Sequence, residues 1–323
     1  MRVLTLLVAL LAAACSSGPR PDVFTYTGSN QQAMAGELWL PEGTGRVPVV
    51  VVSHDVRGKR DAHLMDYVNA LKGAGAAVLV LDHYSSRSVD PSSGPPANRA
   101  FVTAVDFAFD DLGALDGLAR HPRIDIRRAG LLGFGEGGGA GALLAAHQAV
   151  QSGRPANAPR YLAVAAVTPE CAYRLGNRSV GRTPILMILA DRDNRTGRAP
   201  CEDLASYLRA AGANVTVNVY RNARHGFDDP PGPVRQDPQG ENITRCIWQQ
   251  GSDGLWRERA SGISGISLFR VGANPQTIDA YNRSRAACRT LGTETQGDAA
   301  LRSRAVGEVM GFLKQHVIDA RVR

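Results

Sequence analysis

The chain has 323 residues, which is long enough to bury a full core in a single α/β domain. Its apolar fraction of 44% and charged fraction of 21% are typical of a globular protein. The net charge of +7 comes from scattered arginines, and no basic block alternates with aromatic residues. We therefore expect a solvated basic surface rather than a nucleic-acid-binding site.

The first residues are typical of an export signal. A positive start at Arg2 precedes an apolar run over residues 3–14, and Cys15 follows. This order resembles a bacterial lipoprotein signal. We therefore expect residues 1–14 to be removed, Cys15 to be lipidated, and residues 15–22 to tether the protein to a membrane of the cell envelope or periplasm. Ordinary cleavage, giving a secreted soluble protein, or an uncleaved anchor is the alternative. No later stretch approaches the about 20 apolar residues of a membrane span.

Strands and helices alternate along most of the remaining chain. Short entry strands are predicted at Val23–Tyr26 and Glu37–Leu40. Apolar runs of the kind found in strands buried on both faces follow at Val47–Ser53, Ala76–Leu81, Ala129–Phe134, Tyr161–Val167, Ile185–Ala190 and Asn214–Tyr220. Helices are predicted at about Arg60–Lys72, Arg99–Arg120, Glu136–Val150, Pro200–Ala211 and Ala299–Val317. The alternation predicts an α/β fold with a mostly parallel central sheet and helices on both faces.

The pattern breaks between Asp228 and about Gly297, a stretch rich in Pro, Gly, Asn and Arg. Because it carries Trp248 and Trp256, we expect a packed insertion before the last helix rather than a disordered linker. These tryptophans could line a pocket mouth, but we favour a role in a small core of the insertion itself. The whole of residues 23–323 is therefore expected to be one domain with an insertion at about 228–297.

Cysteine usage agrees with an oxidising compartment. Apart from Cys15 the number is even, with Cys171, Cys201, Cys246 and Cys288. Of the three possible pairings we prefer Cys171–Cys201 and Cys246–Cys288, because each pair lies within one local region. Free buried thiols are the alternative, and Cys171 could also lie near the active-site cleft. No metal site is expected, since neither Cys-x-x-Cys nor His-x-x-x-His spacing occurs.

The glycine-rich stretch after the third long apolar run has two interpretations. Gly133, Gly135 and Gly138 satisfy the dinucleotide pattern G-x-G-x-x-G. That motif should open the first βαβ unit and be followed by an acidic residue, yet residues 140–169 contain no Asp or Glu. We therefore prefer the second interpretation, a nucleophile elbow of the form G-x-Nu-x-G, and expect no cofactor. Gly133 and Gly137 supply the small residues that this strained turn requires.

An acid and a histidine follow the elbow, each just past a predicted strand. With these motifs, the chain from about Val23 to Asp228 resembles the dienelactone hydrolase family, with matching segments at Val51–Gly58, Val80–Asp82 and His225–Phe227. The resemblance implies an α/β-hydrolase fold, Asp193 as triad acid (Asp191 is the fallback) and His225 as general base. It also implies an oxyanion hole formed by backbone N–H groups of Glu136 and of Asp55 or Val56.

One departure from the family pattern affects the mechanism. The alignment places Gly135 at the nucleophile, and glycine has no atom that can attack a carbonyl carbon. Glu136 is expected to point away from the cleft and to support the first turn of the helix. One hypothesis is a hydrolase of ester- or lactone-type bonds, in which His225 activates a water molecule in the space left by the missing side chain. The other is a non-catalytic cell-envelope protein that binds a small-molecule ligand in the retained pocket.

Overall fold

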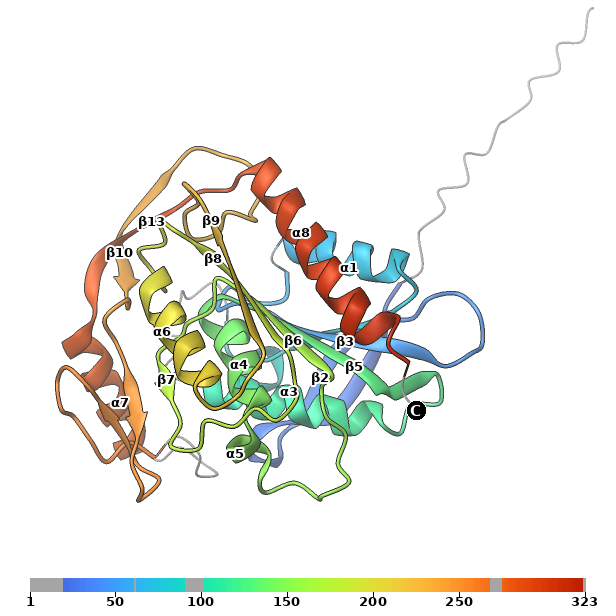
Figure 1. The fold of residues 1–323 in the computed structure, drawn as a ribbon, viewed down its shortest axis with the longest axis horizontal. Coiled ribbons are helices and arrows are strands. Elements are labelled where there is room, and N and C mark those ends of the chain that lie inside the picture. Colours follow the sequence, from blue (N-terminus) through green and yellow to red (C-terminus); the bar gives the residue numbers. More distant parts are fainter. Residues whose placement is uncertain (1–19, 61, 91–101, 268–274, 322–323) are drawn as a thin grey trace, which may run out of the picture.

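An eight-stranded sheet forms the centre of the computed structural model, which describes residues 20–60, 62–90, 102–267 and 275–321 (Figure 1). The strands lie in the order β1-β2-β4-β3-β5-β6-β8-β9. Their bounds are β1 (Asp22–Thr27), β2 (Ala33–Trp39), β3 (Val47–Ser53), β4 (Ala77–Asp82), β5 (Ile124–Phe134), β6 (Ala163–Val167), β8 (Ile185–Ala190) and β9 (Val215–Tyr220). All neighbours from β4 to β9 are parallel, whereas β1 and β2 join as an antiparallel edge. The predicted α/β fold with a mostly parallel sheet is confirmed.

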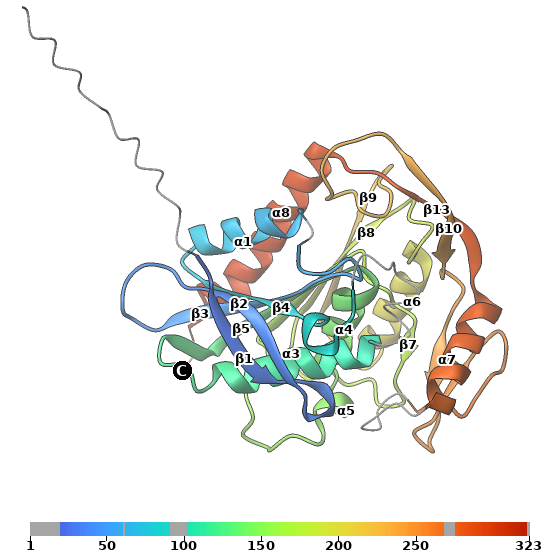
Figure 2. The same cartoon turned by 180° about the vertical axis from the view of Figure 1, so that it is seen from behind.

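The central strands are buried because helices cover both faces of the sheet. One face is covered by α1 (Leu64–Gly73) and α8 (Ala299–Leu313), which is followed by the π-helical turn η5 (Lys314–Ile318). The other face is covered by α3 (Ala104–Leu118), α4 (Ala140–Ala146) and α6 (Arg198–Arg209) (Figure 2). The long apolar runs are thus strands buried on both sides, and the predicted bounds of β3 and β8 agree with those observed. The run at Asn214–Tyr220 is the exception, because its strand β9 forms the edge of the sheet and only its first and last residues are buried.

The helix predicted from Arg60 begins four residues later, at Leu64, and the helix predicted at Pro200–Ala211 spans Arg198–Arg209. Two further predicted helices differ more. A helix was expected at Arg99–Arg120, but α3 begins after Thr103, whose side chain forms a capping box with Asp106, and residues 91–101 lie outside the described part of the chain. The helix expected at Glu136–Val150 is divided into the π-helical turn η4 (Gly135–Gly139), α4 and the short α5 (Gln148–Gln151).

The insertion before α8 has secondary structure that the sequence did not predict. β10 (Arg235–Asn242) pairs antiparallel with β13 (Thr290–Thr295), and the helix α7 (Pro275–Cys288) lies between them in the chain. A second small sheet joins β12 (Trp256–Glu258) and β11 (Trp248–Gln250) to β7 (Tyr173–Arg174) of the main fold. The insertion is therefore paired to the α/β core by backbone hydrogen bonds.

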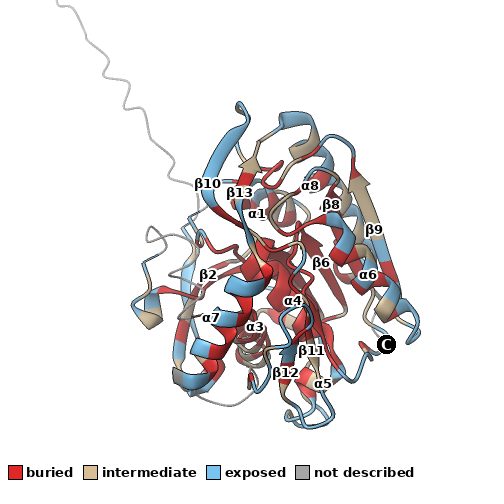
Figure 3. Ribbon diagram, turned by 90° about the vertical axis from the view of Figure 1, so that its left-hand side faces the viewer, coloured by how far each residue is buried: buried red, intermediate tan, exposed pale blue. Residues whose placement is uncertain are grey.

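One disulfide closes a loop inside the insertion, a second lies in the main fold, and aromatic packing joins the insertion to the main fold. The bonds are Cys171–Cys201 and Cys246–Cys288, the pairing preferred from the sequence. Trp248 and Trp256 are fully buried and pack on Tyr173 of β7, at ring-centroid distances of 5.5 and 5.9 Å. They belong to the same apolar cluster as α3, α4 and α6, so they fill a core shared with the main fold. Figure 3 shows that exposed residues gather on the outer side of α7 and β10.

The amino-terminal expectations lie mostly outside the described residues. The expected signal at residues 1–14, Cys15 and the tether as far as residue 19 are not described, and β1 already begins at Asp22. Within the described ranges, no helix combines the length and the hydropathy needed to cross a membrane.

Candidate active site

The chain turns sharply at Gly135, between the end of β5 and η4. The φ angle of Gly135 is +59°, in the left-handed region that favours glycine. A β-carbon at Gly133 would lie 2.0 Å from the carbonyl oxygen of Gly138, and one at Gly137 would lie 2.7 Å from Cζ of Phe107. Strand and helix approach so closely that these positions require glycine, which is the steric condition of a nucleophile elbow.

The space beside Gly135 is filled by the side chain of Asp55, which lies in the loop after β3. A β-carbon built at Gly135 would be 2.2 Å from both Cγ and Oδ1 of Asp55. The carboxylate therefore stands where the side chain of a serine or cysteine nucleophile would begin. One of the two hypotheses from the sequence places a water molecule in this space, and in the structure the Asp55 carboxylate lies there instead.

The backbone donors of the elbow bind this carboxylate. Oδ1 of Asp55 accepts hydrogen bonds from the N–H of Glu136 at 2.9 Å and from the N–H of Gly137 at 3.4 Å. The Glu136 N–H, expected as an oxyanion-hole donor, is thus already engaged by an anionic group of the protein. Val56 is the alternative to Asp55 as the second backbone donor of the oxyanion hole. It lies in the same loop and is buried.

The expected acid and base lie against each other at the carboxyl ends of β8 and β9. His225 Nδ1 is 3.0 Å from Oδ2 of Asp193, and both residues are buried. Asp193 Oδ2 also accepts from the Thr196 hydroxyl at 2.8 Å, and its Oδ1 accepts from the N–H groups of Arg195 and Thr196 at 2.8 and 3.0 Å. Asp191, the fallback acid, instead donates its backbone N–H to the carbonyl of Tyr220. The structure brings together Asp193 and His225.

The charges of this pair outweigh the effect of burial. Burial alone would lower the pKa of His225, but the neighbouring Asp193 carboxylate raises the pKa of His225 above its ordinary value. Burial would raise the pKa of Asp193, but His225 and the hydrogen bonds from Arg195 and Thr196 lower the pKa of Asp193. Asp193 is therefore an acceptor that keeps a proton on Nδ1 of His225, and Nε2 is the nitrogen that can accept another proton.

Asp55 and His225 are held near each other by a contact between their loops. Arg57 donates to both carboxylate oxygens of Asp229, at 2.9 and 2.7 Å, and His63 Nδ1 lies 3.4 Å from the same side chain. Asp229 follows His225 by four residues, and Arg57 follows Asp55 by two. The charge of Asp55 lies close enough to His225 to favour its protonated form. The elbow, the histidine and the carboxylate of Asp55 thus form one site.

The backbone of Asp55 is fixed by a buried histidine. Burial, together with the neighbouring His83, lowers the pKa of His54 to about 3, so its imidazole is neutral. His54 Nε2 accepts from the backbone N–H of His83 at 3.2 Å, which leaves the proton on Nδ1. Nδ1 therefore donates to the carbonyl oxygen of Asp55 at 2.6 Å. The carbonyl also accepts from the N–H of Gly58 at 2.9 Å.

A second Ser-His-Asp arrangement lies beneath this loop, and sequence analysis missed it. Ser53 Oγ is 2.9 Å from Nε2 of His83, whose Nδ1 is 2.8 Å from Oδ2 of Asp110. All three residues have 0% exposure, so no substrate can reach the serine. Arg87 also binds Asp110 through both its terminal nitrogens. The arrangement is a buried polar connection between β3, β4 and α3. The sequence did carry a signal for this arrangement, because polar residues, Ser53 among them, stand at the ends of the first two long apolar runs.

Glu136 is not merely a first-turn residue that supports the helix dipole. Its side chain is 1% exposed and binds Arg195 Nε at 2.5 Å and Arg285 Nη2 at 2.8 Å. Arg285 comes from α7 of the insertion and also contacts Glu170 at 3.3 Å and Glu241 at 2.9 Å. The residue next to the elbow is therefore joined to the insertion by buried ion pairs, which no sequence pattern indicated.

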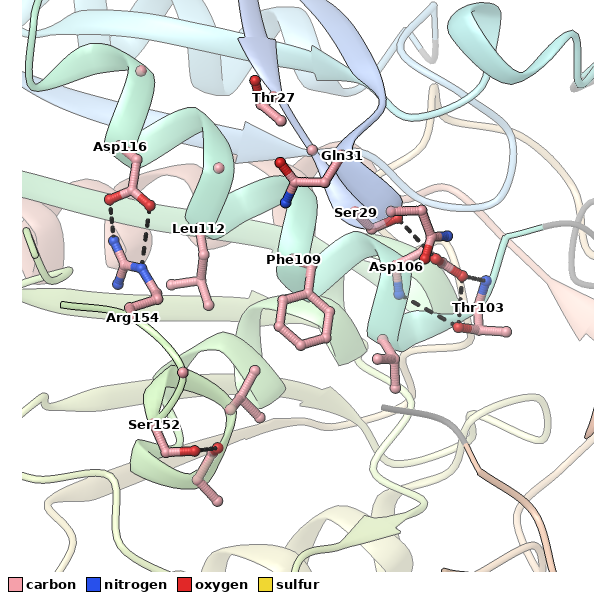
Figure 4. A pocket seen from close by; sticks show the side chains of 18 of the residues that line it. Thr27, Ser29, Gln31, Thr103, Asp106, Phe109, Leu112, Asp116, Ser152 and Arg154 are labelled. Carbon is pink, nitrogen blue, oxygen red and sulfur yellow. Dashed lines mark hydrogen bonds and ion pairs between the residues drawn. The ribbon is translucent and has the colours of Figure 1, made fainter. Parts of the chain in front are cut away.

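A cavity of about 760 Å³ lies elsewhere, along the outer side of α3 (Figure 4). The turn η1 (Ser29–Gln31), α5 and α7 complete its walls. Figure 4 shows Phe109 and Leu112 in the middle, with the Asp116–Arg154 ion pair on one side. Asp55, Gly135 and His225 do not line it. The cavity is therefore separate from the site at the elbow. Among the described residues, no group of three or more His, Cys, Asp or Glu side chains could hold a metal ion.

Comparisons with known proteins give the family of the chain. The model of the dienelactone hydrolase family matches residues 34–249, a segment that includes Asp55, Gly135, Asp193 and His225. No curated protein matches. A Klebsiella pneumoniae protein assigned as a dienelactone hydrolase has a TM-score of 0.48 and 23% identity, over 64% of this chain and 88% of its own. Esterase 2 of Thermogutta terrifontis, phosphorylated by paraoxon, has a TM-score of 0.48 and 18% identity, over 65% and 85%. Since the family model matches most of the sequence, the chain belongs to the dienelactone hydrolase family.

Proposed function

We propose that the protein hydrolyses ester- or lactone-type bonds and that His225, oriented by Asp193, activates the water molecule. The observation that carries this proposal is the 3.0 Å contact between His225 Nδ1 and Asp193 Oδ2 beside an elbow-type turn. A buried carboxylate that orients an imidazole leaves Nε2 as a general base. Membership in a hydrolase family supports the same reaction class.

The proposed base does not depend on a nucleophile at residue 135. An active site that lacks the triad nucleophile can retain a rate about 10³ to 10⁴ above that of water when binding and oxyanion contacts remain. Here Asp55 binds the Glu136 N–H, so we expect slow turnover of ordinary esters. The water molecule from which His225 takes a proton must lie beside Nε2 rather than at Gly135, where the Asp55 carboxylate stands.

The second candidate is a non-catalytic binding protein, and one observation favours it. The elbow N–H groups that would hold a substrate oxyanion already bind a carboxylate of the protein, and Gly135 carries no reactive atom. A small-molecule ligand would then be held without bond cleavage. The two candidates differ in one measurable property, which is turnover that depends on His225.

The test is hydrolysis of p-nitrophenyl acetate by the unmodified protein and by His225→Ala. His316→Ala, at the far end of the chain in η5, is the matched control for loss of an imidazole. We expect slow turnover that is lost in His225→Ala and kept in His316→Ala. Turnover that survives in His225→Ala contradicts the proposed base, and an inert unmodified protein that binds a lactone or ester ligand supports the binding function.

We further propose that the protein is exported and attached to a cell-envelope membrane through a lipid on Cys15. Two disulfides support an oxidising compartment outside the cytoplasm. A secreted soluble protein is the alternative. Membrane fractions of cells that make the full chain should contain it, and Cys15→Ala should move it to the soluble fraction. Equal distribution of the two forms would contradict a lipid anchor at Cys15.

A further inference from the structure

We propose that Asp55 is the catalytic nucleophile, attacking a saturated carbon of a strained lactone and carrying the reaction intermediate as an ester on its carboxylate. The proposal rests on the hydrolase function proposed above and adds its nucleophile and substrate class. It starts from one distance: a β-carbon at Gly135 would lie 2.2 Å from Oδ1 of Asp55. A reactive oxygen therefore stands at the elbow although the elbow residue is glycine.

The two oxygens of Asp55 have different surroundings. Oδ1 accepts from the N–H groups of Glu136 and Gly137, whereas Oδ2 has no hydrogen bond within the described ranges. An oxygen that is not hydrogen-bonded is the better nucleophile, because no donor must be removed before it attacks. Carboxylates are established nucleophiles in covalent catalysis. The geometry points to Oδ2 as the attacking atom and Oδ1 as the oxygen held by the elbow.

The different roles of the two Asp55 oxygens determine which type of substrate carbon can be attacked. Attack on a carbonyl carbon places negative charge on the substrate oxygen, which then needs N–H donors. Those donors are occupied by Oδ1 of Asp55. Attack on a saturated carbon creates no substrate oxyanion at that carbon and requires only a good leaving group. In a strained lactone the leaving group is the ring carboxylate, and release of ring strain assists its departure.

The chemistry balances in two steps. In the first, a lone pair of Asp55 Oδ2 forms a bond to the ring carbon, and the ring C–O bond breaks with its electron pair going to the product carboxylate. In the second, Nε2 of His225 takes a proton from water, and the resulting hydroxide attacks Cγ of the Asp55 ester. The charge that develops on Oδ1 is held by the Glu136 and Gly137 N–H groups. The Cγ–Oδ2 bond then breaks, and the product alkoxide takes the proton from His225. The remaining proton of the water leaves the Asp55 carboxyl group for solvent, which regenerates the Asp55 carboxylate with one oxygen from water.

Asp55 is also held rigidly enough for this role. Its carbonyl oxygen accepts from His54 Nδ1 and from the N–H of Gly58, at 2.6 and 2.9 Å. Arg57 ties the loop to Asp229, in the segment that carries His225. The nucleophile and its partner base are therefore positioned by contacts that do not involve the reacting oxygens.

The test uses unmodified full-length protein in excess over β-butyrolactone, in water labelled with heavy oxygen. After one turnover and subtraction of a protein-free blank, peptides are analysed by mass spectrometry. We expect the label in the side chain of Asp55 and none in the 3-hydroxybutyrate carboxylate. Label in the product carboxylate, with an unlabelled Asp55, would show that water attacks the acyl carbon; Asp55 would then not be the nucleophile, while the hydrolase function would stand.

Two variants complete the experiment. In His225→Gln the second step lacks its base, so we expect one lactone equivalent to remain attached to Asp55. Asp55→Asn keeps the size of the side chain and should lower turnover by about 10³-fold or more. Asp66→Asn, on the exposed side of α1, is the matched control. No turnover by the unmodified protein together with no adduct in His225→Gln would contradict both this inference and the hydrolase function. The labelling result decides the question even if Asp55→Asn does not fold.

Discussion

Arg285 of α7 donates to Glu136, the first residue after the elbow, with Nη2 2.8 Å from Oε2. The two residues are 149 positions apart in the chain, and both side chains are at most 4% exposed. Arg285 is also shared with Glu170 and Glu241. Burial alone would lower the pKa of Arg285, but Glu170 and Glu136 raise the pKa above its ordinary value. The insertion therefore supplies a cation on which the packing of the elbow depends.

Replacing this cation should destabilise the protein strongly. In Arg285→Met, three buried acidic side chains lose the charge between them, and breaking a buried ion pair costs about 3–5 kcal/mol. Arg283→Met is the matched control, because the Arg283–Asp279 pair is 65% exposed on both sides and should contribute less than about 0.5 kcal/mol. Unfolding by urea measures both. Equal free energies of unfolding for the two variants would contradict the role given to Arg285.

The Cys246–Cys288 bond should stabilise the same insertion by restricting the unfolded chain. It joins residues 42 positions apart, and in the chain-entropy model such a loop contributes roughly 4 kcal/mol. The double variant Cys246→Ala/Cys288→Ala should lose about that free energy of unfolding. Cys171→Ala/Cys201→Ala, which opens a loop of 30 residues, should lose slightly less. A stable Cys246→Ala/Cys288→Ala protein would show that packing of Trp248 and Trp256 is sufficient to hold the insertion.

The sequence predicted the parts of the fold that depend on local patterns. Continuous apolar runs such as Val47–Ser53 and Ile185–Ala190 identified the buried strands with correct bounds. The start of α3 was placed too early, although the capping pair Thr103 and Asp106 was a readable signal. In the insertion, the sequence of α7 mixes apolar and polar residues on all sides of the helix and has no apolar stripe. The helical periodicity of this segment could therefore not be recognised.

The site was predictable only where its parts follow strands. Asp193 and His225 were singled out because parallel strands bring their carboxyl ends to one edge of the sheet. The side chain of Asp55 was not expected at Gly135, because its direction depends on the loop conformation set by His54 and Gly58. The contact between Arg285 and Glu136 joins distant segments, and a single sequence carries no signal for such a pair.

The pH dependence of turnover should report the coupling of His225 to Asp193. A base must be neutral, and Asp193 raises the pKa of His225, so kcat, which includes the step in which His225 activates water, should rise with pH through an apparent pKa above 6.5. In Asp193→Asn, burial still lowers the pKa of His225 and the carboxylate that raised it is gone. The apparent pKa of this limb should therefore move below 6.5, and turnover should fall. Steady-state turnover of β-butyrolactone at saturating concentration across pH measures the limb. A limb that does not move in Asp193→Asn would contradict this coupling.

The same shifts predict how the pair contributes to stability. The raised pKa of His225 means that its contribution is fully present below the unfolded value of 6.5 and is lost as pH rises through the folded pKa. The lowered pKa of Asp193 means that its contribution is present above the unfolded value of 3.8 and is lost as pH falls through the folded pKa. The difference in free energy of unfolding between unmodified protein and His225→Gln should therefore be greatest between these two unfolded values. A difference that is constant with pH would show that the pair does not titrate on unfolding.

A serine at the elbow should restore an ordinary triad only if Asp55 is removed as well. In Gly135→Ser the new β-carbon would lie 2.2 Å from the Asp55 carboxylate, and overpacking of this kind costs about 1–3 kcal/mol. We expect Gly135→Ser to be destabilised and to gain no esterase activity. In Gly135→Ser/Asp55→Gly the space and the Glu136 N–H are both released, so the serine can attack a carbonyl carbon and its oxyanion can be held. Hydrolysis of p-nitrophenyl acetate, with a burst of p-nitrophenol, measures the gain. A burst in the single variant would show that Asp55 leaves the elbow readily, because the carboxylate and a serine side chain cannot occupy the same space.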